Sequence, residues 1–497
     1  MLRYSVSQVL QGLRQSQVGV ERNRAVHTSD DLAKVAMPLP NELLQAISSP
    51  GGGQVALILG AGCSVEAPTS IPVARTISLE IHRRLVGDGV LQDGDCANPE
   101  DLSHLADAVF ARTNSQREVV ERFLAQYNLK LAAANEGYHI AAAMLSEGAI
   151  SSVVTLNFDL GLSAALADLG VGPIVGLIES PEHLPRQRAV NIYYLHRNAN
   201  AAPELWVLRT GRLQVDWTQW EPIIATRVLT APVVVFAGLG TPVAVILESS
   251  QLILEALPNA RSVYQVDPAD QADSQFSQES GLDAAHYIRL EWGEFMDQLS
   301  QRLIAEHLHQ LEQAINRKVG EEGLMNEDVG NLLIQLRVVG LVKQGMLRSD
   351  WVLHDMRYRK VDPDVINLIA DLFLALGLMM RVSGTVAAIV EDGIIEFHRD
   401  ERTVAAYILA SGRGHRSTSA VEADVDHRRR RYAKHLRAPR GIIVGGTSNA
   451  VIQAPTPPAD IRLGDVSVDN LIGPIGMPMY HISELRANPA RVEEMLP

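Results

Sequence analysis

The stretch Val55–Pro72 reads VALILGAGCSVEAPTSIP, and it decides the fold. Its first five residues are apolar, and Gly60-Ala61-Gly62 follows them at once. A segment with helical spacing begins at Pro72. An apolar strand that leads through a small-residue turn into a helix is typical of a nucleotide-binding α/β unit. Small residues let backbone N–H groups approach a pyrophosphate closely, so this turn is a candidate phosphate site.

Val65 occupies the position of the third glycine in the dinucleotide fingerprint, so the stretch alone does not define a dehydrogenase site. Four later segments also end predicted strands. They are Thr155–Asp159 (TLNFD), Tyr193–His196 (YYLH), Ala237–Thr241 (AGLGT) and Gln265–Asp267 (QVD). Leu205–Arg209 is a further candidate strand. Strands that alternate with helices predict an α/β fold with a doubly wound, Rossmann-like parallel sheet, here with a helical insertion before Thr155. Ligands bind such sheets at the carboxyl ends of the strands, where all five motifs lie.

In this order the five motifs resemble those of the sirtuin, or SIR2-like, family across about residues 54–300. The resemblance implies that Asn157 contacts the nicotinamide-side ribose and orients a water, and that Asp159 contributes to the nucleotide pocket. It also implies that His196 is a general base. By residue type alone, Asn157 and Asp159 are equally ordinary turn and cap residues. A lone histidine at a strand end, such as His196, is usually structural.

The resemblance further implies that NAD is bound, as the substrate. The cofactor-binding residues would be Gly60, Ala61, Gly62, Ser64 and Pro72 near the pyrophosphate, Asn157 and Asp159, and Gly238, Gly240, Thr241 and Asp267 near the adenosine. The alternative for Gly238, Gly240 and Thr241 is an ordinary glycine turn after the fourth strand. The alternative for Asp267 is that it caps the turn at Pro268. Cys63 is expected to fill space in the core.

Two departures from the family pattern narrow the function. Arg197 stands where a glycine normally follows the histidine, and Cys63 and Cys96 are the only cysteines, so no CxxC zinc module exists and no metal is expected. The chain therefore resembles the zinc-less bacterial NADases of antiphage defence. That resemblance implies an NAD⁺ glycohydrolase that releases nicotinamide and ADP-ribose. An NAD-dependent protein deacylase and a non-catalytic NAD or ADP-ribose sensor are the alternatives.

Composition limits the cellular setting. Two cysteines and the lack of an apolar signal core fit a reducing, cytoplasmic compartment. A formal net charge of −14 argues against generic binding of nucleic acid or acidic membranes. The basic run at residues 427–440 leaves contact with nucleic acid or an acidic partner open, although a solvated face explains it as well. No membrane span is expected.

A length of 497 residues predicts two to four domains. We expect a helical lead-in at residues 1–50, a SIR2-like catalytic domain at 51–300 and a mixed, mainly helical regulatory or oligomerisation region at 301–497. In the last region, Val386–Phe397 resembles a hairpin. Val365–Met380 is apolar on nearly every face and must be buried against something. A homo-oligomer or a partner defence protein would supply such a contact.

Overall fold

The computed structural model describes residues 39–49, 52–172, 175–240, 243–258, 261–322, 326–351, 363–390, 394–400, 402–410, 439–444 and 478–496. The chain forms two units, Met1–Pro40 and Asn41–Pro497, and only the last two residues of the first are among those described. Over the described ranges, no helix combines the length and apolarity needed to cross a membrane.

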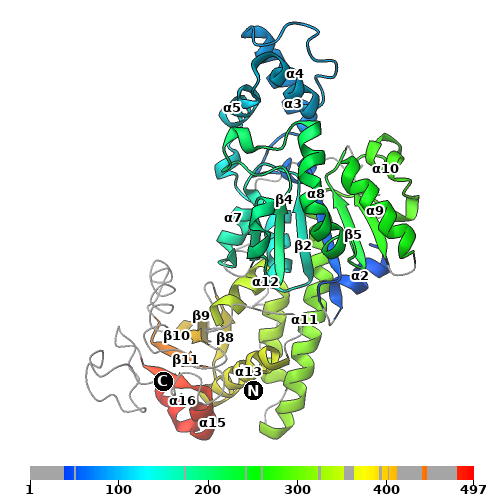
Figure 1. The fold of residues 1–497 in the computed structure, drawn as a ribbon. Coiled ribbons are helices and arrows are strands. Elements are labelled where there is room, and N and C mark those ends of the chain that lie inside the picture. The colour runs from blue at the N-terminus through cyan, green and yellow to red at the C-terminus, as the bar shows by residue number, and fades with distance from the viewer. Residues whose placement is uncertain are drawn as a thin grey trace, which may run out of the picture. The chain divides into compact units, whose positions relative to one another are not determined.

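A seven-stranded parallel sheet with the order β3-β4-β2-β1-β5-β6-β7 forms the centre of the second unit (Figure 1). Its strands are β1 (Val55–Leu59), β2 (Ile150–Thr155), β3 (Val175–Ile178), β4 (Val190–Tyr194), β5 (Val233–Ala237), β6 (Ser262–Val266) and β7 (Tyr287–Ile288). Leu59 at the end of β1 is in register with Thr155 of β2 and Ala237 of β5. The loops that follow these three strands therefore begin side by side. The predicted α/β class and parallel sheet are confirmed.

Helices pack on both faces of the sheet, and its central strands are therefore buried. Every residue of β1 is buried, and Ala56 and Ile58 join a core cluster with Trp220 and Ile224 of α8. The helices around the sheet are α2 (Asn41–Ser48), α6 (Glu136–Ser146), α7 (Gly161–Asp168), α8 (Thr210–Arg227), α9 (Ala244–Ala256) and α10 (Gln275–Ser280). α2 contacts β1 and β5, and α6 contacts β2. This double covering explains why the strands read as continuous apolar runs.

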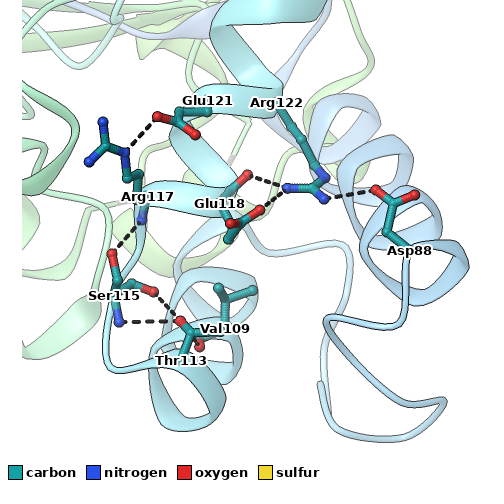
Figure 2. Close-up of polar contacts among 8 residues, drawn as sticks. All are labelled: Asp88, Val109, Thr113, Ser115, Arg117, Glu118, Glu121 and Arg122. Carbon is teal, nitrogen blue, oxygen red and sulfur yellow. Dashed lines mark hydrogen bonds and ion pairs between the residues drawn. The ribbon is translucent and has the colours of Figure 1, made fainter.

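Three helices between β1 and β2 form the predicted insertion and group together in Figure 1. They are α3 (Ala74–Gly87), α4 (Leu102–Thr113) and α5 (Arg117–Gln126). Their apolar faces share a second core cluster that includes Phe158 and Trp206. Figure 2 shows that Arg122 of α5 contacts Glu118 on its own helix and Asp88 at the end of α3, the latter at 2.7 Å. The insertion is thus a small packed layer joined to the loop after β2.

The segment Leu205–Arg209 is not the strand that its composition suggested. It follows a short 3₁₀ turn, Pro203–Leu205, and pairs with no strand among the described residues. Trp206 instead stacks on Phe158, with ring centroids 4.3 Å apart. Burial of this large ring holds the segment against the insertion, and it leads directly into α8.

The region after the sheet is mixed, as predicted. It contains α11 (Trp292–Glu322), α12 (Asn326–Trp351), α13 (Pro363–Ser383), α15 (Ile482–Ala487) and α16 (Pro489–Met495). A second sheet has the order β12-β11-β10-β9-β8, formed by β8 (Val386–Ile389), β9 (Ile394–Arg399), β10 (Arg402–Ala410), β11 (Gly441–Val444) and β12 (Met479–His481). β8 and β9 are antiparallel, so the predicted hairpin is confirmed, although its turn lies outside the described residues.

The apolar helix α13 finds its burial within the chain. It contacts α11, α12, α15 and α16, and Leu372–Leu376 are all buried. Its composition is therefore no argument for an oligomer. The basic run at residues 427–440 lies almost wholly outside the described residues. The boundary proposed at residue 300 falls inside α11, which contacts α6 as well as α13.

Candidate functional site

The five motif-bearing strands are neighbours in the sheet, in the order β4-β2-β1-β5-β6. All their pairings are parallel, so the loops after these strands meet at one edge. This edge brings together the turn at Gly60–Ser64, Asn157 and Asp159, His196, Gly238 and Asp267. Thr241 lies outside the described residues. Pro72 lies two residues before α3 and is half-buried.

The glycines after β1 are explained first by packing. A Cβ on Gly62 would lie 2.7 Å from the Cα of Gly238. A Cβ on Gly60 would lie 2.5 Å from the carbonyl oxygen of Gly238. Gly238 has a φ of 64°, in the left-handed region that favours glycine. The turns after β1 and β5 therefore touch through their backbones, and no side chain fits between them.

This contact also occupies N–H groups that were expected to face a pyrophosphate. The N–H of Gly60 donates to the Ala237 carbonyl, and that of Gly62 to the Gly238 carbonyl, each at 2.9 Å. Among the described hydrogen bonds, the Ala61 N–H has none. Ala61 is thus the residue of the turn with a backbone donor left for an anion.

Ser64 points inward and joins a buried polar network. Its hydroxyl donates to the Asp159 carboxylate at 2.7 Å and lies 2.7 Å from the hydroxyl of Tyr138. The amide nitrogen of Asn157 donates one proton to the Gly60 carbonyl at 2.9 Å, and its second proton is shared between the Tyr138 hydroxyl at 3.0 Å and Ser64 at 3.1 Å. The side chains come from the β1 turn, the β2 loop and α6.

The orientation of the Asn157 amide follows from its partners. The Gly60 carbonyl can only accept, so the Asn157 nitrogen must face it and the amide oxygen must face away. That oxygen makes no hydrogen bond within the described ranges and keeps some contact with solvent. Asn157 therefore presents a fixed acceptor to whatever occupies the site.

Asp159 is buried, and burial raises the pKa of its carboxyl group. The hydroxyl of Ser64 and the backbone N–H of Gly161, which donates to Oδ1 at 2.9 Å, oppose this shift. Each carboxylate oxygen thus accepts from a protein donor, so Asp159 helps to orient Ser64 and the start of α7.

His196 follows β4 and is half-buried, but its Nε2 atom is completely buried. Among the described residues this nitrogen has no hydrogen-bond partner. The ring lies 5.6 Å from the ring of Phe158. Burial, with a smaller contribution from the neighbouring Arg197 guanidinium, lowers the pKa of His196 to about 4. The imidazole is therefore neutral at pH 7 and able to accept a proton.

Arg197 occupies a backbone position suited to glycine, with a φ of 70°. Its Nη2 donates to Asp216 of α8 at 2.9 Å, and the side chains are 11% and 13% exposed. This largely buried ion pair holds an arginine in a left-handed conformation. The departure from the family pattern thus fills the space beside His196 with a packed side chain.

At the end of β6, the Oδ1 of Asp267 accepts from the N–H of Ala269 at 2.9 Å, as a turn residue would. The carboxyl is half-buried, and burial raises its pKa. Gly240 is exposed, and a Cβ there would meet nothing within 4 Å.

Two residues of the network and one beside it were not predicted. Tyr138 lies in an almost wholly buried helix, and Asn135 donates from the start of that helix to the Cys63 carbonyl at 2.8 Å. Glu66, in the loop after the β1 turn, accepts from the N–H of Gly293. Only the position of Glu66 two residues after the motif serine hints at a role. His139, the residue after Tyr138, contacts the Asp168 carboxylate at 3.0 Å and the Asn135 carbonyl at 3.1 Å, and neither Ser64 nor Asn157 is among its described partners.

Across the described ranges, no group of three or more His, Cys, Asp or Glu residues is arranged to hold a metal ion. The expected absence of a metal remains a prediction.

Comparison with solved structures gives a likeness to Sir2 homologues over about half of the chain. One is a mutant Sir2 homologue in complex with ADP-ribose, with 16% identity over 53% of this chain and 96% of that one, and a TM-score of 0.32. Another is a Sir2 homologue in complex with NAD, with 17% identity over 52% and 92% and a TM-score of 0.31. A Sir2 complex with a p53 peptide and NAD⁺ has 14% identity over 51% and 94% and a TM-score of 0.30. Neither a protein-family model nor a curated protein matches the chain. With TM-scores below 0.5, the likeness establishes neither a family nor a ligand.

Proposed function

We propose that this protein is an NAD⁺ glycohydrolase, which cleaves NAD⁺ and water to nicotinamide, ADP-ribose and a proton. The observation that carries the proposal is the meeting of the Asn157 network and neutral His196 at one edge of the sheet, beside the turn after β1. A buried nitrogen without a partner is uncommon in proteins, and His196 Nε2 is suited to a ligand hydroxyl.

The proposed binding mode follows the order of the loops. The Ala61 N–H would donate to the pyrophosphate, and Asp267 would accept from an adenosine hydroxyl. Asn157 would face the nicotinamide-side ribose, and Gly238 and Gly240 would lie along the adenosine half. Because the N–H groups of Gly60 and Gly62 are occupied, the pyrophosphate has fewer backbone donors than the motif alone suggested.

The proposed chemistry needs little from the protein beyond positioning. Nicotinamide leaves as a neutral molecule when the bond from C1′ of the ribose to its nitrogen breaks, because the pyridinium carries the positive charge in NAD⁺. The amide oxygen of Asn157 would orient a water toward C1′ as the new C–O bond forms. His196 would take the released proton or hydrogen-bond a ribose hydroxyl. A group with a pKa of about 4 holds a proton weakly, so a role as hydrogen-bond acceptor suits His196 best.

Two alternatives make different predictions. A protein deacylase needs a groove for an acyl-lysine peptide beside the histidine, and the Arg197–Asp216 pair packs into that neighbourhood. A sensor would bind NAD or ADP-ribose without cleaving it. We further propose that the enzyme is a regulated, cytoplasmic antiphage effector that acts as a homo-oligomer or with a partner protein. Its resemblance to zinc-less defence NADases is the support for this role.

One incubation separates the three functions. Purified protein is incubated with NAD⁺, with and without an acyl-lysine peptide, and nicotinamide and ADP-ribose are measured. Peptide-independent release of both products is expected. Replacing His196 or Asn157 by Ala should reduce the rate by about 10²-fold or more without unfolding the protein. Folded variants that cleave NAD⁺ at the wild-type rate would exclude the assignment.

We propose that the region after the sheet regulates this site through α11. Both carboxylate oxygens of Glu66, in the loop after the β1 turn, accept from the N–H of Gly293 at 2.9 and 3.1 Å, at the start of α11. The neighbouring Trp292 lies edge-on to Tyr138. α11 is 31 residues long and contacts α12 and α13. A displacement of α11 would therefore disturb both the Glu66 contact after the β1 turn and the packing of Trp292 on Tyr138.

The test keeps the full chain, because a truncation at residue 300 would cut α11. Glu66→Gln removes one carboxylate charge at a helix N-terminus and should weaken the cap by about 1 kcal/mol. Hydrogen exchange in the first turn of α11 should increase, and basal NAD⁺ cleavage should change. Glu118→Gln, at a partly exposed ion pair on α5, is the control. Faster exchange with unchanged cleavage would remove the regulatory role of α11.

A further inference from the structure

We propose that Tyr138 is a positioning residue that fixes both the Asn157 amide and the Asp159 carboxylate, an inference that rests on the proposed function. Tyr138 lies on α6, outside all five strand-end motifs. It is 2% exposed, and its hydroxyl contacts both Ser64 and Asn157. Both partners are predicted ligand-binding residues, so Tyr138 would act on the ligand through them.

The direction of the hydrogen bonds can be derived from donor counts. An ionised Asp159 carboxylate only accepts, so Ser64 gives its single proton to Asp159. Tyr138 must then donate to the Ser64 oxygen, and its own oxygen accepts from the Asn157 amide. The chain of donors therefore runs from Asn157 to Tyr138 to Ser64 to Asp159.

A protonated Asp159 would disturb this order. Its proton would point to Ser64, which would then donate to Tyr138, and the Tyr138 proton would lack an acceptor because the Asn157 nitrogen cannot accept. All members are satisfied together only when Asp159 is ionised. The hydroxyl of Tyr138 thus links the charge state of Asp159 to the orientation of Asn157.

The surroundings hold Tyr138 in place. A Cβ added to Gly161 would lie 3.0 Å from the Tyr138 ring, so the ring packs directly on the start of α7. The N–H of Tyr138 donates to Asn135, whose amide nitrogen donates to the Cys63 carbonyl of the β1 turn. These contacts leave the ring fixed if only its hydroxyl is removed.

Tyr138 on α6, Cys63 in the β1 turn and Tyr194 on β4 face Asp159, and burial raises the pKa of each. All three therefore stay neutral between pH 4 and pH 8. A change of pH in this range leaves the charge of these neighbours unchanged.

The experiment compares Tyr138→Phe with Tyr193→Phe in the full chain. Tyr193 on β4 is equally buried, and its hydroxyl accepts from the Gln187 amide at 3.1 Å, so the control loses a hydrogen bond that does not involve the groups facing Asp159. For Tyr138→Phe we expect kcat for NAD⁺ cleavage to fall about tenfold, the scale of a lost positioning hydrogen bond of 1.4 kcal/mol, with KM changed less than twofold. The acidic limb of its pH–rate profile should move to higher pH.

A second measurement does not depend on activity. Loss of the Tyr138 donor should raise the pKa of Asp159 further, so the stability difference between Tyr138→Phe and wild type should be larger at pH 8 than at pH 4. Tyr193→Phe should show a constant difference. If the wild type does not cleave NAD⁺ but this pH dependence appears, the network role stands and the proposed function fails. A pH-independent difference, with a wild-type pH–rate profile where there is activity, would show that Tyr138 only packs.

Discussion

Acidification should destabilise the folded protein through His196 by an amount that can be worked out from its pKa. The folded-state pKa is about 4, whereas an unfolded histidine titrates near 6.5. As the pH falls, the unfolded chain therefore binds this proton first. At 1.36 kcal/mol for each pKa unit, the difference corresponds to about 3 kcal/mol of stability. That stability is fully present above about pH 6.5 and is lost as the pH falls toward about 4.

A variant that cannot titrate isolates this contribution. Urea unfolding of the wild type and of His196→Gln is measured at pH 7 and at pH 4. Both proteins share the remaining titratable groups, so the wild type should lose about 3 kcal/mol more than the variant between the two pH values. The burial of Nε2 and the nearby Arg197 are the physical causes. An equal loss in both proteins would refute the reasoning, because His196 would then titrate alike in the folded and unfolded states.

Three other predictions concern the turns and the reaction. Gly62→Ala should lower stability by about 1–3 kcal/mol in chemical denaturation, because its Cβ would press on the backbone of Gly238; Gly240→Ala, with open space around it, should change little, and equal effects would contradict the packing account. Arg197→Gly should relieve about 1–2 kcal/mol of backbone strain but leave the largely buried Asp216 unpaired at about 3–5 kcal/mol, for a net loss of about 2 kcal/mol; adding Asp216→Ala should restore part of it, and a more stable single variant would show that strain dominates. NAD⁺ cleavage should survive exhaustive EDTA treatment, and loss of activity that one metal restores would reveal a missed site.

The parallel sheet could be predicted because its central strands are local apolar runs, whereas the two-residue strand β7 was not predicted. Val55–Leu59 and Pro232–Ala237 are buried nearly throughout, and their continuous hydrophobicity follows from helices on both faces. The strand ends then placed the motifs at one edge. The order of the strands is set by long-range packing and could not be derived from any one segment.

The second sheet was predicted only where its pairing is local. β8 and β9 form a hairpin and were predicted as one. β10 pairs with β11 across about thirty residues, and β12 joins from further along the chain. Such pairings leave no turn signal between the strands, so sequence periodicity alone could not reveal this sheet.

In the site, sequence found the residues at strand ends and missed those that arrive from helices. Tyr138 belongs to a helix in which nearly every residue is buried, so a tyrosine there looks like core. Its role depends on one hydroxyl that meets the loop after β2. Glu66 caps a helix that begins more than two hundred residues later. Both roles arise from contacts between distant segments.

The turn after β1 limits which substitutions can test the proposed reaction. Gly60 and Gly62 are required by their backbone contact with Gly238, so replacing them would disturb the turn whether or not a phosphate binds there. Lost activity in such variants would not separate the two causes. The His196 Nε2 atom makes no hydrogen bond to the described protein, so its removal costs the fold less. The amide nitrogen of Asn157 holds the buried network, so an Asn157 variant must first be shown to be folded. A loss of NAD⁺ cleavage in folded Asn157 and His196 variants then reports on chemistry, and the glycine variants report on packing.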